Sequence, residues 1–546
     1  MTQQILLLME ATGIQDYVFG SNQLAQNIGA SELVTQATTD WVYQELPQPH
    51  NVEQDPIHPD RWRITDRALV ADGLAAEVVY AGGGNAMILF ADDDRADAFA
   101  RRLTQRILAA APGLQVLLKR QSFNPHGQAL AKLHHDLHRG LAKRKLDRPR
   151  SVPLMGLSVT AACIFTGAPA VALDEERRLI SAEVSAKLSN EKAGKERLKR
   201  HLSGIKLAGY EFVYDFDMLG SKGEASYLAV VHADGNRMGE RIKAIGAKFP
   251  HPEDNTNYVQ ALRRFSESVQ TAASVALNRT VGMLLAPDNI ERDDKGNQLL
   301  GGMVPIWGNQ YLPFRPIVFG GDDVTFVAEG RLGLEIAARY LSEYASHRLA
   351  DGDRVDGKLA EGFPAYARAG VAVVKTHYPF SRAYELADDL CQSAKAYIKE
   401  RTNRGEPGVT AVDWHFAVAG LVLPLKDIRE REYTAREGTL LMRPLRLNDP
   451  SQDWRSWRTF FDLTYEFQRQ NGEWAGRRNK VKALRDALRE GKDATQIFLR
   501  NIAAALPPIP GQPELKHTGW HRGVCGYFDV IEALDFYVPL HGGFRG

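Results

Sequence analysis

Cysteine is scarce in this 546-residue chain, and its three cysteines, Cys163, Cys391 and Cys525, lie far apart. This scarcity excludes a disulfide framework and a Cys-x-x-Cys zinc site, so no zinc is expected, and it fits a reducing compartment. No apolar run is long enough to span a membrane, and the short run 5–9 lacks the basic start of a signal peptide. We therefore expect a cytoplasmic protein without membrane contact.

An excess of charge of one sign is also absent, because 68 Lys and Arg balance 67 Asp and Glu. The charge is nevertheless uneven: residues 119–150 hold nine Lys or Arg and four His against two Asp. This basic run is either a solvated helix face or a surface for RNA or phosphate. His134 and His138 would share one helical face, but in so charged a helix we expect a solvated surface rather than a metal site. Walker A, His-Glu-x-x-His and Gly-x-Ser-x-Gly motifs are missing, so ATPase, zincin and hydrolase functions lack support.

The sequence Gly320-Gly321-Asp322-Asp323 stands between two apolar, β-branched runs and predicts a β-hairpin with a tight turn. Paired carboxylates at such a tip repel each other, and each raises the other's pKa. A divalent cation removes that cost, and Asp oxygens are the ligands that Mg²⁺ prefers. The alternative is an exposed turn with two solvated Asp, since Gly and Asp are ordinary turn residues.

A second hairpin of the same type is predicted at residues 77–90, where Gly82-Gly83-Gly84-Asn85 falls on Gly320–Asp323. Strand-forming residues flank both tips, which indicates an internal duplication. In the first copy both carboxylates are missing, because Gly84 has no side chain and Asn85 is neutral. We therefore interpret the first copy as a pseudo-site.

The second copy shows the order strand, helix, strand, hairpin, helix, strand, helix, which predicts an α+β sandwich with a ferredoxin-like antiparallel sheet. The expected elements are a strand ending at Asp234, a helix over 258–278, a strand near 281–286, a helix over 332–348, a strand over 366–374 and a helix opened by Pro379. The chain as a whole is expected to contain two such palm units with a helical connector and a helical C-terminal domain. The expected bounds are 1–110 for the degenerate palm, 111–221 for the basic connector, 222–425 for the catalytic palm and 426–546 for the C-terminal domain.

Three carboxylates are expected to converge, because Asp234 ends a strand that neighbours the hairpin carrying Asp322 and Asp323. Gly235 would let a metal or phosphate approach the backbone closely. The three carboxylates, together with a backbone carbonyl after Asp234, would bind two Mg²⁺ or Mn²⁺ ions. Two such ions are the usual arrangement for in-line nucleotidyl transfer. Lys395, beside the apolar stripe of the last helix, is either a solvated lysine or a point charge for the β- and γ-phosphates.

These motifs together resemble a known family. Asp234–Gly239, the Gly-Gly-Asp-Asp hairpin, Ala369–Val373, and Pro379 with the Ala394-Lys395 pair are similar to the catalytic palm in the large subunit of type III CRISPR effector complexes. The diguanylate cyclases share the same palm order. The segment Thr12–Phe19 and the Gly82–Asn85 hairpin resemble the first, non-catalytic palm of that subunit.

The resemblance implies a cyclase that joins ATP into cyclic oligoadenylate, an antiviral second messenger, with ATP bound between the two palms. It also implies other effector subunits, a guide RNA and activation by target RNA. The nucleotide-binding residues that it implies are Gly235, Asn236, Gly320, Gly321, Lys395, Gly82, Gly83 and Gly84.

Two departures from the family pattern stand out. The first palm strand begins at Ile5, so no N-terminal HD nuclease is expected, and the usual zinc cluster between the palms is missing. A stand-alone cyclic-dinucleotide synthase, or an RNA-binding scaffold subunit with little catalysis, therefore remains an alternative. A templated polymerase or a diguanylate cyclase is a further one.

Overall fold

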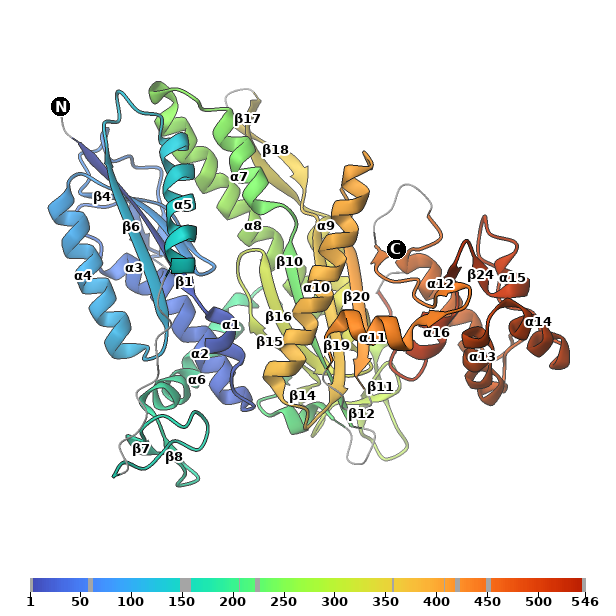
Figure 1. Ribbon diagram of the computed structural model, residues 1–546. Helices are drawn as coiled ribbons and strands as arrows, with labels where there is room; N and C mark the ends of the chain where they lie inside the picture. The colour runs from blue at the N-terminus through green and yellow to red at the C-terminus, as the bar shows by residue number, and fades with distance from the viewer. Residues whose placement is uncertain are drawn as a thin grey trace.

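The computed structural model describes most of the chain, in the ranges 3–56, 62–147, 159–205, 207–220, 226–355, 358–406, 408–417, 423–447 and 453–542. Residues 148–150 of the predicted basic run lie outside the described residues. Figure 1 shows the N-terminal sheet on one side, a larger sheet in the middle and the C-terminal helices on the other side.

The first sheet is antiparallel, with the strand order β4-β5-β1-β6. Its strands are β1 (Gln4–Thr12), β4 (Ala76–Gly82), β5 (Asn85–Phe90) and β6 (Gln115–Phe123). Leu6 and Leu8 are buried on one face of β1, whereas Ile5 and Leu7 are buried on the other. Both faces of this sheet are therefore covered, which explains why β1 is apolar without alternation.

The second sheet has six strands in the order β15-β16-β10-β19-β20-β23. They are β10 (Tyr227–Gly235), β15 (Phe314–Val318), β16 (Asp323–Glu329), β19 (Ala367–Lys375), β20 (Ala411–Ala417) and β23 (Leu445–Arg446). Its first four strands repeat the order of the first sheet, because β10 lies between β16 and β19 as β1 lies between β5 and β6. The predicted α+β class with two ferredoxin-like units is confirmed, and both predicted Gly-rich hairpins are present.

Helices follow the strands in the same order in both units. The first unit has α1 (Ile14–Phe19), α2 (Leu24–Thr35), α3 (Trp41–Gln44), α4 (Asp93–Ala110) and α5 (Leu130–Asp147). The second has α7 (Met238–Ala247), α8 (Asn255–Leu284), α9 (Gly333–Ala345) and α10 (Phe380–Asn403). The strand predicted near 281–286 is wrong, because α8 continues to Leu284 with Val281 and Leu284 buried.

The basic run 119–150 also differs from the expectation of a helical connector. Its first residues belong to β6, which completes the first sheet, and the run continues into α5. His134, expected to be solvated, is buried on α5, and its Nδ1 lies 2.8 Å from the hydroxyl of Tyr258 on α8. The helix turns this histidine inward because Leu130 and Leu137, one turn away, and Leu141, two turns away, are buried on the same side.

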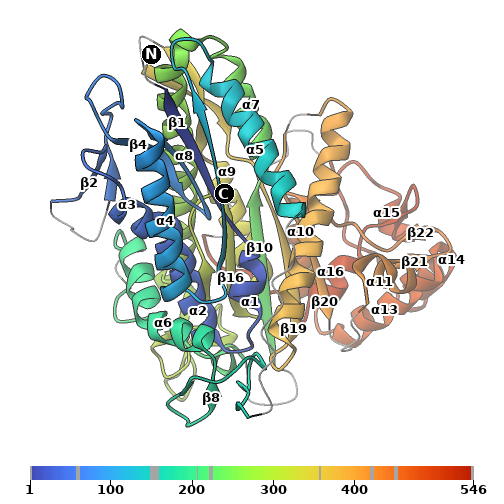
Figure 2. The same cartoon turned by 60° about the vertical axis from the view of Figure 1, so that its left-hand side comes forward.

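The two units pack against each other through matching helices. In one contact, Phe19 of α1 stacks on Tyr384 of α10 with ring centroids 3.9 Å apart. In the other, α5 contacts both α7 and α8. Figure 2 shows α5 running beside α7 on the side of the molecule opposite to α2 and α6. Each unit therefore contributes its first and last helices to the interface, as expected for a duplicated fold.

The remaining described elements flank this core. The strand pair β2/β3 (Val52–Gln54, Trp62–Ile64) lies within the first unit, between α3 and β4. Between the two units along the chain lie the strand pair β7/β8 (Ala172–Leu173, Leu179–Ile180), α6 (Ala182–His201) and β9 (Glu211–Phe212). Within the second unit lie β11 (Ile290–Arg292), β12 (Gln298–Leu300), β13 (Val304–Pro305), β14 (Tyr311–Leu312) and the hairpin β17/β18 (Arg348–Val355, Lys358–Pro364).

The C-terminal region is mainly helical, as predicted, but it also holds a small sheet. Its helices are α11 (Leu425–Glu432), α12 (Trp457–Gln468), α13 (Arg478–Glu490), α14 (Lys492–Asn501), α15 (Leu515–Thr518) and α16 (Phe528–Ala533). The small sheet consists of β21 (Thr434–Ala435), β22 (Gly438–Thr439), β24 (Trp520–His521) and β25 (Val524–Cys525). Within the described ranges, no helix combines the length and the apolar character that crossing a bilayer requires.

Candidate active site

Strand register brings the predicted carboxylates together at one end of the second sheet. Asp234 on β10 lies directly opposite Asp323 on β16. The backbone N–H of Gly235 donates to the carbonyl of Asp322 at 3.0 Å, so the hairpin tip is tied to the end of β10. Cross-strand partners share a face of the sheet, so Asp234 and Asp323 lie on the face that α10 covers. Asp322 lies beyond the end of its strand.

Glycine is required where the backbones meet. A Cβ on Gly235 would lie 2.8 Å from the Cβ of Asp322 and 2.3 Å from the Cε of Met238, which leaves no room for a side chain. At the hairpin tip, Gly320 and Gly321 have φ values of 133° and 71°, which side chains disfavour. The glycines in this motif therefore allow Asp322 to lie close to the backbone of β10.

The pKa values of Asp322 and Asp323 are both raised. Burial, together with the charges of Asp234 and Asp323, raises the pKa of Asp322 to about 7. Burial also raises the pKa of Asp323, and the charges of Asp234 and Asp388 add to this effect, while His232 opposes it. The Oδ1 atom of Asp323 is buried and accepts no hydrogen bond. The negative charge of the carboxylates at this end of the sheet is therefore only partly neutralised by the neighbouring side chains.

His232 lies between two of the acidic side chains, and sequence reasoning missed it. Its Nδ1 is 3.4 Å from Oδ1 of Asp323, and its Nε2 is 3.5 Å from Oδ1 of Asp388 on α10. The imidazole is only 4% exposed. The sequence does contain a signal for His232. It is a polar residue in an otherwise apolar strand, two positions before Asp234, and residues i and i+2 of a strand share a face.

Arg368 was also missed, and it makes the closest contacts in the site. This arginine lies on β19 directly opposite Asp234, and it is 2% exposed. Its Nη1 donates to the carbonyl of Gly235 at 2.9 Å and to Oδ1 of Asn236 at 3.0 Å, while its Nη2 donates to Oδ2 of Asp234. A single arginine in a strand of small apolar residues was the available signal, because buried arginines are rare unless paired.

The residues present fit a divalent cation. The carboxylates of Asp322 and Asp323 are hard oxygen ligands whose pKa values are raised, and the Oδ1 atom of Asp323 is buried without a hydrogen bond. A bound divalent cation would stabilise these groups in their charged form. Within the described residues, no group of three or more His, Cys, Asp or Glu side chains is placed so that it could hold a metal ion by itself. Asp234, the expected third ligand, is instead paired with Arg368.

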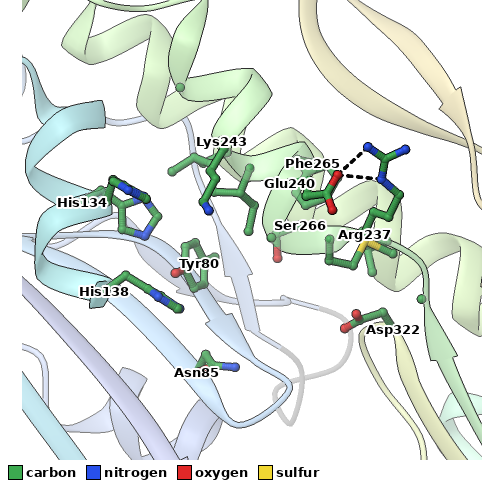
Figure 3. Close-up of a pocket in the computed structure, with 18 of the residues that line it drawn as sticks. Tyr80, Asn85, His134, His138, Arg237, Glu240, Lys243, Phe265, Ser266 and Asp322 are labelled. Carbon is green, nitrogen blue, oxygen red and sulfur yellow. Dashed lines mark hydrogen bonds and ion pairs between the residues drawn. The ribbon is translucent and has the colours of Figure 1, made fainter. Parts of the chain in front are cut away.

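A large cleft of about 1670 Å³ lies beside these residues, between the two units. Asp234, Gly235, Asn236, Gly321 and Asp322 line one wall, and residues of the first unit, including Gly82, Gly83 and Asn85, line the other. The two hairpin tips nearly touch, since a Cβ on Gly321 would lie 3.9 Å from the Cα of Gly83. Figure 3 shows Asp322 across the cleft from Asn85 and His138. Gly84, Gly320 and Asp323 are not part of the lining.

Cations line the other walls of this cleft. Lys395 and Lys399 of α10 face it, together with residues of α5, of α7 and of the turn before it, namely Lys132, Arg139, Lys243 and Arg237. Figure 3 shows Lys243 and Arg237 on opposite sides of Ser266. Two cations in the α5 part of the predicted basic run, Lys132 and Arg139, therefore face the cleft, where positive charge attracts phosphate groups.

The first unit carries the same framework with other side chains. Register places Glu10 opposite Asn85 and Leu117, as Asp234 lies opposite Asp323 and Arg368. Glu10 pairs with Lys145 of α5, with Nζ and Oε1 2.7 Å apart. The first copy therefore keeps one acidic residue and has lost the arginine and the paired carboxylates.

Comparison with known proteins gives matches among solved structures alone. No protein-family model matches the chain, and no curated protein matches it. Csm1 of T. onnurineus is similar over 98% of this chain and 70% of that chain, with a TM-score of 0.50 and 14% identity. The Csm1-Csm4 cassette in complex with one ATP gives a TM-score of 0.51 at 14% identity, with the same coverage. The cassette in complex with pppApApA gives 0.50 at 13% identity, over 98% and 69% of the two chains. The chain therefore has the fold of Csm1, as the predicted resemblance implied.

Proposed function

We propose that this protein is a nucleotidyl cyclase that joins ATP into cyclic oligoadenylate, as the palm subunit of a type III CRISPR effector. The observation that carries the proposal is the cleft between the two Gly-rich hairpins, in which Asp234 and Asp322 lie among seven cationic side chains, Arg368 included. Carboxylates that hold a divalent cation, beside cations that hold phosphates, are the components of nucleotidyl transfer. The related fold in complex with ATP and with pppApApA supports adenine nucleotides as substrates.

In this mechanism, Asp322, Asp323 and Asp234 are the catalytic carboxylates that would hold Mg²⁺ or Mn²⁺. The ion, when bound, lowers the pKa of the attacking hydroxyl and neutralises charge on the phosphates. A hydroxyl of one nucleotide attacks the α-phosphorus of another, the new oxygen–phosphorus bond forms, the bond to pyrophosphate breaks, and the proton of the hydroxyl passes to solvent water in the cleft. Closing the ring repeats the step within one molecule.

The chain's own cations bind and orient the triphosphate. Lys395 and Lys399 of α10 and Lys243 of α7 line the cleft that also holds Asp234 and Asp322. The attraction between a lysine and a phosphate group is strongest where water is excluded from around the phosphate oxygens. We assign Lys395 to the leaving pyrophosphate, together with the backbone of Gly235, Asn236 and Gly321, which lie on the same wall.

The first unit binds nucleotide without making bonds. Gly82, Gly83 and Gly84 form a tip with positive φ values of 135°, 58° and 83°, as the catalytic hairpin does. Without a paired carboxylate there, the first unit supplies a binding wall. The cleft exceeds the ~300–1,000 Å³ of pockets for single small ligands, so it has room for two nucleotides.

The proposed partners follow from the same assignment. Csm1 is found with Csm4 in the related structures, so we propose that this chain works with other effector subunits, a guide RNA and an activating target RNA. Exposed cations of α5 outside the cleft, such as Lys143 and Arg144, are available for an RNA backbone.

The test is to incubate the purified protein with each of the four NTPs and with Mg²⁺ or Mn²⁺, with and without effector subunits and target RNA. Products are identified by mass spectrometry. We expect ATP to give cyclic oligoadenylate and pyrophosphate. Conversion of GTP alone to a cyclic dinucleotide, or RNA binding without any nucleotide product, would reject the proposal.

A further inference from the structure

The guanidinium of Arg368 occupies groups that a second metal ion would need. It contacts the carboxylate of Asp234, the backbone carbonyl of Gly235 and the side-chain oxygen of Asn236. These are three of the oxygen-bearing groups at and just beyond the end of β10. Oxygens of this kind are the ligands of Mg²⁺ and Mn²⁺, and here a side chain of the protein already binds all three groups.

Two-ion catalysis places two cations about 3.5–4 Å apart, each with several oxygen ligands. Once Arg368 holds the end of β10, the oxygens that remain are those of Asp322 and Asp323 and the second oxygen of Asp234. Asp323 does not line the cleft, and its Oδ1 lies on the side of His232. A second ion would therefore lack the oxygens that Arg368 binds and would have to share its carboxylate ligands with the first ion.

Arg368 is held firmly in this position. It is 2% exposed, its strand is hydrogen-bonded to β10 on one side and to β20 on the other, and α10 covers its face of the sheet. A guanidinium does not lose its proton in proteins. Displacing it would leave a buried positive charge without its carboxylate, which is a strongly unfavourable state. An incoming ion would therefore have to bind beside the arginine.

We propose that Arg368 takes the place of one of the two divalent cations, so that this site works with one bound ion and one fixed guanidinium. The inference rests on the proposed nucleotidyl transfer. Arg368 neutralises Asp234 permanently and presents fixed positive charge at the catalytic end of β10. Arginine stabilises phosphate charge in this way in other transfer reactions. The expectation of two ions is therefore replaced by one ion and one arginine.

The experiment counts ions. The protein is crystallised with Mn²⁺ and α,β-methylene ATP, which resists nucleotidyl transfer, and anomalous scattering locates manganese. Electron paramagnetic resonance titration with Mn²⁺ gives the number of ions per chain in solution. We expect one Mn²⁺ beside Asp322 and an unchanged contact between Arg368 and the Gly235 carbonyl. Two ions, or none, would overturn the inference.

Variants sharpen the count. Arg368→Ser frees the oxygens at the end of β10, so we expect it to bind a second Mn²⁺, whereas Arg368→Lys keeps a charge there and stays at one. Arg241→Met is the matched control, because Arg241 is a partly buried arginine on α7 that donates to the carbonyl of Pro364 and contacts no carboxylate of the site. We expect Arg241→Met to bind one ion. An Arg368→Ser variant that folds and still binds one ion would also overturn the inference, and if it does not fold, the wild-type count decides.

Failure of this inference and failure of the proposed function give different results. Two Mn²⁺ ions in a wild-type protein that converts ATP would remove the role of Arg368 and leave the cyclase intact. One ion that is retained in the crystal, with no conversion of any NTP, would support the ion count and reject the cyclase.

Discussion

Replacing Asp322 with Asn is expected to stabilise the fold while it removes activity. Asp322 lies at the hairpin tip beside Asp234 and Asp323, and burial with these neighbouring charges raises its pKa to about 7. Its ionised form is therefore disfavoured in the folded protein. Asn keeps the shape of the side chain and removes the charge, so the folded state no longer bears the repulsion.

The size of the effect follows from the pKa. A rise from the ordinary value of 3.8 to about 7 corresponds to ~4 kcal/mol of destabilisation at pH 8. Water in the cleft screens part of this charge, so we expect a measured gain of about 2 kcal/mol. Because the folded pKa is raised, the cost of ionised Asp322 is fully present above pH 7 and is absent below about pH 4. The gain from Asn must follow the same course.

The assay is thermal or urea unfolding of wild type and Asp322→Asn in EDTA, from pH 4 to pH 8. The matched control is Asp234→Asn, which is expected to lower stability by ~3 kcal/mol, because it leaves Arg368 buried without its carboxylate. Asp486→Asn, on the exposed side of α13, should change little. The reasoning fails if Asp322→Asn destabilises the protein at pH 8, or if its gain does not shrink toward pH 4.

Three further predictions concern activity. Lys395→Gln should raise the KM for ATP about tenfold, because it removes a charge from the triphosphate wall, whereas Lys426→Gln on an exposed part of α11 should leave kinetics unchanged in the same steady-state assay. His232→Phe should lower kcat by ~10–100-fold, because Asp323 and Asp388 lose the imidazole between them; an unchanged kcat would contradict this. The rate at subsaturating Mg²⁺ should fall as the pH drops below about 7, as Asp322 takes up a proton, and a flat pH–rate profile would argue against an ionised Asp322.

Local patterns were enough to predict the duplicated framework. Glycine pairs between β-branched runs identified both hairpins, and their similarity indicated the repeat. The end of α8 was mispredicted, because Val281 and its neighbours have strand-like composition, yet packing of one helical face continues the helix to Leu284. Strand β6 was missed because its basic residues, Lys119 and Arg120, were assigned to a connector.

The carboxylates could be predicted from the sequence, whereas their partners could not. Asp322 and Asp323 stand in a recognisable motif, and Asp234 follows a clear strand. The contacts of Arg368 and His232 with the carboxylates arise from strand pairing and from the packing of α10. They can be identified only once the sheet is assembled. A single arginine among small apolar residues indicates a buried charge, but it does not say which carboxylate that charge will meet.

The most direct test of the proposed function compares wild type with the double variant Asp322→Asn/Asp323→Asn. Both are incubated with ATP, Mg²⁺ or Mn²⁺, effector subunits and target RNA, and products are identified by mass spectrometry. We predict cyclic oligoadenylate and pyrophosphate from wild type, and neither from the variant, whose circular dichroism spectrum stays that of the wild type. Equal product from the two proteins would contradict the assignment of catalysis to the Gly-Gly-Asp-Asp hairpin.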